Sequence, residues 1–301
     1  MMVSAWILGT ALQTPGSGTG PTMDLEQMMG VIVLYAVLLL LGLAINVYLL
    51  IRYIGHPTVW VRKINRLLWR PWGWSDVSFT VLIILFLHAF VLGLLHLLHM
   101  TGWLAAWDEQ YLWILAHSIV LHWAAIAIVM FRAHQRGISW NVGFAHVRWS
   151  CRNDIVKGVI AYVAAVPILI FYAAVFHVWL QWTGHEPEPQ DVVRLFAELD
   201  AGFMFYYFIF LALFLAPVSE EILFRGLLLP ALGRRWGMGA AILVSSVLFA
   251  LMHFHIPSLV PLFVFSVALS LAYIYTESII VPIVMHMLFN GVSLMVMVMI
   301  G

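Results

Sequence analysis

The sequence predicts an all-α, polytopic membrane protein with about eight transmembrane helices. Hydrophobic residues make up 64% of the 301-residue chain and charged residues only 9%, with a mean hydropathy of +1.01. In a soluble domain about a quarter of the residues are charged. The apolar residues also lie in long continuous runs without the alternation of a membrane β-barrel, as expected for helices that satisfy their own backbone hydrogen bonds in lipid.

The individual spans follow from the ~20-residue length that a bilayer requires of a helix. The expected spans are residues 28–52, 78–100, 111–131, 156–182, 202–232, 238–253, 259–276 and 279–300. The breaks at Ile256-Pro257 and at Thr276-Glu277-Ser278 are short, so the boundaries of the last three spans are open and seven spans are an alternative.

The segments outside the spans indicate three parts. Residues 1–22 form a lead that contains Gly and Pro and lacks the basic region of a signal peptide, and Met23 after it is an alternative first residue. An acidic, Pro-containing loop, residues 183–200, separates the first four expected spans from the later ones. We therefore expect an N-terminal four-helix membrane bundle of unknown role over residues 23–182 and a second membrane domain over residues 183–301.

The basic residues predict an orientation. Twelve of the 14 Lys and Arg residues fall on one side of the expected spans, while Arg194 lies opposite and Arg225 lies within a span. By the positive-inside rule the basic side faces the cytoplasm. The prediction is a multi-pass protein of the cell's inner (plasma) membrane with both termini outside.

Composition also excludes several function classes. The single cysteine, Cys151, rules out a disulfide framework and a multi-cysteine metal cluster within one chain. The sequence contains no Gly-rich phosphate loop, no nucleic-acid motif and no long charged tail. We expect membrane lipids as partners and no nucleic acid.

One apolar run carries charges that call for a functional explanation. Residues 217–226 read Pro-Val-Ser-Glu-Glu-Ile-Leu-Phe-Arg-Gly inside the expected span 202–232. A charged side chain at membrane depth costs at least about 2.5 kcal/mol, so such residues are rare and paired. Glu221 and Arg225 have the i, i+4 spacing of an ion pair on one helix face. Glu220 points about 100° away from Glu221, so its partner must come from another segment.

Two later segments supply candidate partners for Glu220. Phe249 and His253 are four residues apart, and so are His286 and Asn290, which project from one face of the last expected helix. A carboxylate and an imidazole can together hold and deprotonate water, and an imidazole and a carboxamide can donate hydrogen bonds to an oxyanion. The set is therefore suited to hydrolysis, with Glu220 and His253 acting on water.

Three motifs in this order resemble those of the type II CAAX prenyl endopeptidases, within the superfamily of CAAX proteases, bacteriocin-processing enzymes and abortive-infection membrane proteases. The motifs are Glu220-Glu221-x-x-x-Arg225, Phe249-x-x-x-His253 and His286-x-x-x-Asn290. The resemblance covers about residues 200–300. It implies an intramembrane glutamate-dependent protease core whose site opens to the cytoplasm, with a peptide or lipidated peptide as substrate.

The resemblance also implies a role for each motif residue. Glu220 would be the base that activates water and His253 its partner, while His286 and Asn290 would donate to the oxyanion. The residues expected to shape the site are Glu221, Arg225 and Phe249.

The metal dependence of the expected site has two alternatives. The family has been read as zinc proteases, and Glu220, His253 and His286 could supply the three ligands of a catalytic zinc with an open position. The sequence has no HExxH motif, however, and each candidate ligand comes from a different expected helix. We expect a metal-free site, with zinc as the alternative.

Two alternatives come from other functional classes. The second and third spans carry five histidines that could form a haem or metal site: His88, His96, His99, His117 and His122. The chain could instead be a catalytically silent scaffold or a bacteriocin-immunity protein, in which Glu221 and Arg225 form only a structural ion pair. Ser219 lacks the GxSxG context of a serine nucleophile, so no acyl-enzyme is expected.

Overall fold

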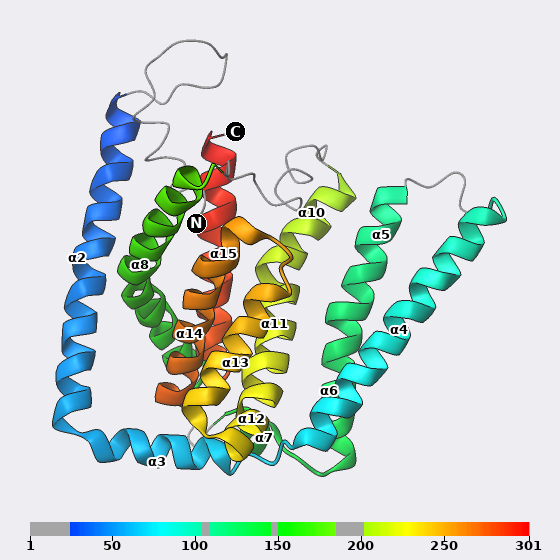
Figure 1. Cartoon of the computed structure of the whole chain (residues 1–301), viewed down its shortest axis with the longest axis horizontal. Coiled ribbons are helices and arrows are strands. Elements are labelled where there is room, and N and C mark those ends of the chain that lie inside the picture. Colours follow the sequence, from blue (N-terminus) through cyan, green and yellow to red (C-terminus); the bar gives the residue numbers. More distant parts are fainter. Residues whose placement is uncertain (1–24, 104–108, 146–149, 185–201, 301) are drawn as a thin grey trace.

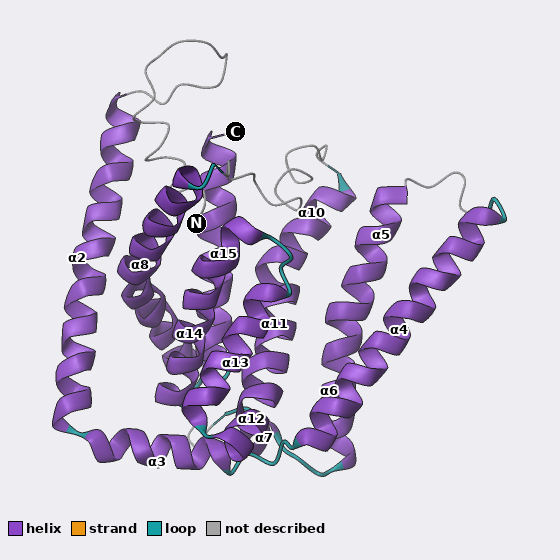
Figure 2. Ribbon diagram, in the orientation of Figure 1, coloured by secondary structure: helices purple, strands orange, loops and turns teal. Residues whose placement is uncertain are grey.

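The structure, a computed structural model, describes residues 25–103, 109–145, 150–184 and 202–300. Within these residues every regular element is a helix and no strand occurs (Figure 2). Six helical segments in the described part of the chain are long and apolar enough to cross a membrane. The prediction of an all-α polytopic membrane fold is confirmed.

The expected number of spans needs a correction. Two of the eight expected spans correspond to shorter apolar helices, Met238–Leu251 and Ile280–Met295 within the described residues. The first has 14 residues, which gives a length of about 21 Å at ~1.5 Å per residue, less than the ~30 Å hydrocarbon core of a bilayer. The sequence run is apolar enough for a span, but the helix ends before His253.

The helices follow one another along the chain with short connections. In chain order they are α2 (Leu25–Gly55), α3 (Pro57–Leu68), α4 (Trp74–Met100), α5 (Glu109–Ser118), η1 (Ile119–Ala124), α6 (Ala125–Gln135), α7 (Trp140–Gly143), α8 (Cys151–Trp182), α10 (Phe203–Phe210), η2 (Leu211–Leu215), α11 (Ala216–Glu221), η3 (Ile222–Leu228), α12 (Leu229–Trp236), α13 (Met238–Leu251), η4 (Ile256–Ser258), α14 (Leu259–Thr276) and α15 (Ile280–Ile300).

The sequence predicted one continuous α-helix over residues 202–232, the charged helix that carries Glu220, Glu221 and Arg225. The structure shows that this helix is not α-helical throughout. Two π-helical segments, η2 and η3, interrupt the run from α10 to α12, and η1 interrupts the run from α5 to α6. A π segment places an extra residue in a turn and rotates the following side chains, and such segments are frequent at functional sites. Here they directly flank α11, which carries both glutamates.

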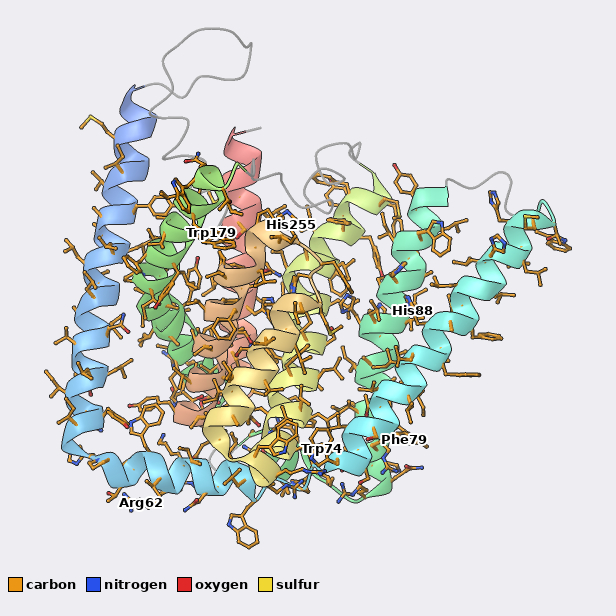
Figure 3. The ribbon with its side chains drawn as sticks, viewed as in Figure 1. Arg62, Trp74, Phe79, His88, Trp179 and His255 are labelled. Carbon is orange, nitrogen blue, oxygen red and sulfur yellow. The ribbon has the colours of Figure 1, made fainter. Side chains whose placement is uncertain are left out.

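The helix α3 was not anticipated. It lies across one end of the bundle, at a steep angle to α2 (Figure 1), and packs Ile64 and Leu67 against the core. Arg62 lies on its outer side (Figure 3). The amine of Lys63 donates to the Tyr275 carbonyl, so α3 is attached to the end of α14.

The packing at the centre of the molecule involves α8. This helix packs against α2, α14 and α15, and in Figure 1 it lies between α2 and α15. The expected boundary between the two membrane domains follows α8 directly. Most of the acidic loop at this boundary lies outside the described residues, and so does the expected lead over residues 1–22. The helix on the N-terminal side of that boundary thus shares a core with the C-terminal helices.

A small residue permits the close approach of α2 to α8. A Cβ atom at Gly42 would lie 2.6 Å from the Pro167 ring and would also meet the Val163 carbonyl oxygen. Nearby, the Asn46 amide donates to the Ala164 carbonyl at 2.7 Å. Glycine at a helix contact lets two membrane helices approach closely enough for such interhelical hydrogen bonds.

We therefore expect Gly42→Ala to lower the free energy of unfolding by about 1–3 kcal/mol, because the added methyl group overpacks the contact with α8. The measurement is thermal unfolding of the detergent-solubilised protein. Gly93→Ala in α4 is the matched control, since a Cβ atom there meets nothing within 4 Å. Equal midpoints for the two variants would show that α2 does not pack on α8 as described.

Candidate active site

A buried cluster joins the charged helix to α14 and α15. Arg225 donates through Nη1 to Glu221 Oε1 at 2.9 Å, so the expected ion pair is confirmed. Its Nη2 donates to the Ser266 carbonyl at 3.0 Å and to the Ser266 hydroxyl at 2.6 Å. Glu221 and Arg225 are at most 1% exposed. The cluster thus compensates buried charge with an opposite charge and hydrogen bonds, as membrane depth requires.

His286 of α15 is held by the same carboxylate. Its Nδ1 lies 2.9 Å from Glu221 Oε1. Because Arg225 also donates to this oxygen, Glu221 is a carboxylate acceptor and His286 Nδ1 must carry the proton. This hydrogen bond fixes the ring orientation and turns its other nitrogen, Nε2, towards Glu220.

Glu220 and Glu221 differ in accessibility. The side chain of Glu220 is 22% exposed, whereas that of Glu221 is fully buried. Glu220 Oε2 lies 3.8 Å from His286 Nε2, longer than a direct hydrogen bond. The partner that Glu220 needed from another segment is therefore His286, whose ring stands between the two glutamates. Of the two carboxylates, only Glu220 can be reached by a reactant.

Phe249 of α13 lies at the centre of the site. Its ring is buried, lies 4.7 Å from the Arg225 guanidinium, and contacts the rings of His286 and His253 with centroids at 5.7 and 4.9 Å. A cation over an aromatic face is attracted by the ring quadrupole. Phe249 therefore separates the two histidines and packs against the cation that orients one of them.

His253 lies in the turn after α13 and points back towards the helix. Its Nδ1 is 2.8 Å from the Phe249 carbonyl oxygen. A carbonyl oxygen can only accept, so Nδ1 carries a proton and Nε2 of the neutral ring is an acceptor. Among the described residues no hydrogen bond or ion pair joins His253 directly to Glu220. The structure brings His253 to the site through Phe249.

The side chain of Asn290 binds the backbone of the charged helix. Its Nδ2 donates to the Ala212 carbonyl at 2.8 Å, and Ala212 belongs to the π-helical segment η2. Asn290 lies one turn beyond His286 on α15, as its spacing predicted, and one of its two amide hydrogens is used to fasten α15 to the charged helix.

The zinc alternative does not fit the observed arrangement. It needs Glu220, His253 and His286 around one point, yet the part of the chain that the structure describes contains no group of three or more His, Cys, Asp or Glu side chains that could hold a metal.

The histidines of the second and third spans separate into different environments. His88 of α4 faces α5 (Figure 3), where its ring contacts that of His117 with centroids 4.9 Å apart. His96 and His99 are exposed. His122 takes no part in this contact: its Nδ1 lies 2.6 Å from the hydroxyl of Ser219, directly before Glu220. No sequence pattern indicated this last contact, because it joins helices 97 residues apart in the chain.

One comparison with known proteins found a match, and it covers the segment that holds the site residues. Residues 202–292 match the family model of the Rce1-like type II CAAX prenyl endopeptidases. No curated protein and no solved structure matches the chain. The matched segment contains both glutamates of α11, both candidate site histidines, Arg225, Phe249 and Asn290. Over residues 202–292 the chain is therefore similar to the Rce1-like type II CAAX prenyl endopeptidases.

Proposed function

We propose that the chain is an intramembrane endopeptidase that hydrolyses a peptide bond in a membrane-associated substrate with water activated by Glu220. One observation carries this proposal. An accessible carboxylate, Glu220, stands 3.8 Å from the imidazole of His286, whose other nitrogen is held by a buried ion pair. Two polar groups at this separation can share one water molecule between them.

In this mechanism Glu220 takes a proton from water while the water oxygen forms a bond to the scissile carbonyl carbon. The protonated Glu220 then gives its proton to the amine as the carbon–nitrogen bond breaks, which restores the carboxylate. The reaction consumes one water molecule and needs no acyl-enzyme. The two peptide fragments carry a new carboxylate and a new amine.

His253 supports the water and His286 supports the oxyanion. With Nδ1 bound to the Phe249 carbonyl, His253 offers Nε2 as an acceptor for the second hydrogen of the water. His286 presents Nε2 beside Glu220, where in the protonated ring it donates to the negative oxygen that develops on the substrate. Asn290 has one amide hydrogen left beside the one that binds Ala212, and we assign it to the same oxyanion.

The substrate class follows from the membrane setting and the family. The reacting groups lie on apolar helices, so the substrate is a peptide held at the membrane, either a prenylated CAAX-type peptide or another membrane-associated peptide. The site would open to the cytoplasmic side of the inner membrane, where the positive-inside rule places the basic loops and α3.

The test is cleavage by the purified, detergent-solubilised protein of fluorogenic CAAX-type peptides, with and without a farnesyl group, in water enriched in ¹⁸O. We expect one ¹⁸O atom in the new carboxylate, because hydrolysis takes this oxygen from water. Absence of cleavage across prenylated and unprenylated membrane peptides would contradict the proposed protease function.

A chelator separates the metal-free mechanism from the zinc alternative. We expect the cleavage rate to change less than about twofold after incubation with EDTA and dialysis, because zinc removal abolishes catalysis only where zinc activates the water. The metal content of the same sample is measured by mass spectrometry. Loss of cleavage that returns with added zinc would make Glu220, His253 and His286 ligands instead.

A further inference from the structure

We propose that His122, which lies outside the matched residues 202–292, is a positioning residue of the active site: its hydrogen bond to Ser219 holds the turn that carries Glu220. This inference rests on the proposed function and extends it to the N-terminal helices, for which neither the motifs nor the family match assigns a role. It is carried by a direct contact between η1 and α11.

The direction of the hydrogen bond follows from the partners of Ser219. The Ser219 hydroxyl is buried and lies 2.9 Å from the Ala216 carbonyl, an oxygen that can only accept. The single hydroxyl hydrogen is used there, so Ser219 Oγ accepts from His122 Nδ1, 2.6 Å away. His122 is thus the donor in a chain that runs from its ring through Ser219 to the backbone of α11.

The position of Ser219 makes this chain relevant to catalysis. Ser219 directly precedes Glu220, and α11 is a short α-helical stretch between two π segments. Because a π segment lies at each end, continuous α-helical hydrogen bonding does not join α11 to its neighbours. Side-chain contacts therefore help to set the orientation of α11 about its helix axis.

Further contacts keep His122 in place along its own helix. One turn before it, the Ser118 hydroxyl lies 2.6 Å from the Tyr207 hydroxyl of α10. Directly after it, the Trp123 ring stacks on Phe210 with centroids 6.4 Å apart. The helix segment that carries His122 therefore runs along the charged helix with contacts before and after the histidine.

The far end of the same segment is also fixed. Arg132 of α6 pairs with the buried Asp76 of α4 at 3.1 Å, and Arg136 pairs with the other oxygen of that carboxylate. These ion pairs join α6 to α4 at the end of the bundle where α3 lies (Figure 1). The imidazole of His122 thus lies on a helix that is fixed by contacts to its neighbours, as a positioning group requires.

The test compares three variants of His122 in the cleavage assay. His122→Leu removes the donor, and His122→Gln moves the amide nitrogen to the place of Nε2. His122→Asn keeps an N–H group at the place of Nδ1. We expect His122→Leu and His122→Gln to lower kcat by about 10–100-fold with an unchanged KM, and His122→Asn to stay within about threefold of the wild type, because small displacements of a reacting group cost rates of this order.

His117→Leu is the matched control. It removes another histidine of the same helical segment, whose Nδ1 binds only the Trp113 carbonyl of its own helix among the described residues. Its cleavage rate is expected to stay within about twofold of the wild type. Wild-type kcat in His122→Leu, or equal losses in His122→Leu and His122→Asn, would overturn the positioning role while the protease function stands.

A second measurement does not depend on cleavage. Thermal unfolding of His122→Leu, Ser219→Ala and the double variant reports whether the two side chains interact, since residues in contact show non-additive effects. We expect the double variant to lose less than the sum of the two single shifts in Tm. Additive shifts would overturn the inference even if the wild-type protein cleaves its substrate.

Discussion

Glu220→Gln is expected to lower kcat for peptide cleavage by about 10²–10⁴-fold, the usual contribution of a positioned general base. Glutamine keeps the shape of the side chain and its hydrogen-bonding capacity, but it cannot accept a proton from water at neutral pH. Because Glu220 is the partly exposed member of the pair, the substitution leaves the buried ion pair of Glu221 and Arg225 intact. The measurement is the initial rate at saturating substrate, together with Tm.

The control for this variant is Glu277→Gln. Glu277 lies in the turn between α14 and α15 and pairs with Arg66 of α3 at 2.7 Å, at the end of the bundle and away from the glutamates of α11. The same chemical change there should leave the rate within about twofold of the wild type, since a pair with one exposed partner contributes little. If Glu220→Gln cleaved as fast as Glu277→Gln, Glu220 would not be the base.

Local patterns predicted the parts of the molecule that local physics controls. Long apolar runs identified the helices, because the bilayer demands length and hydrophobicity of a single segment. The i, i+4 spacing identified the ion pair of Glu221 and Arg225, since both residues lie on one helix face whatever surrounds them. An unpaired charge is costly at membrane depth, so the position of Glu220 within a span predicted that it needs a partner.

The partners themselves depend on how distant helices pack. His253 was the expected partner of Glu220, and the structure places His286 beside it instead, with the ring held by Glu221. The spacing of His286 and Asn290 was sufficient to predict a shared helix face, but not that Asn290 would bind the Ala212 carbonyl. Periodicity specifies the direction of a side chain and not the helix that it meets.

Two further features escaped prediction for physical reasons. The π segments arise where tertiary packing shifts the backbone register, and no residue type marks them in a sequence. The 12-residue helix α3 carries several basic residues and is too polar and short to appear as a span. Its apolar positions at Ile64 and Leu67 repeat at helical spacing, so an amphipathic pattern was the available signal.

Arg225→Met is expected to lower the free energy of unfolding by about 3–5 kcal/mol, because it leaves the buried carboxylate of Glu221 without its cation. Methionine has a comparable length and fills the space beside Phe249, so the loss is mainly electrostatic. Unfolding is measured by heat or by SDS titration in mixed micelles. Arg235→Met is the control, since Arg235 is an exposed arginine ten residues further along the same helical run. Equal stability of the two variants would contradict a buried pair.

The double variant Glu221→Leu/Arg225→Met then distinguishes a structural pair from a catalytic support. Replacing both members of a buried ion pair by apolar residues is often neutral or stabilising, so we expect stability to return to within about 1.5 kcal/mol of the wild type. Cleavage should stay low, because His286 Nδ1 has lost the carboxylate that orients its ring towards Glu220. Recovery of both stability and cleavage would mean that the pair serves the fold alone. Recovery of stability without cleavage would instead make the buried pair the group that keeps the imidazole in its working orientation.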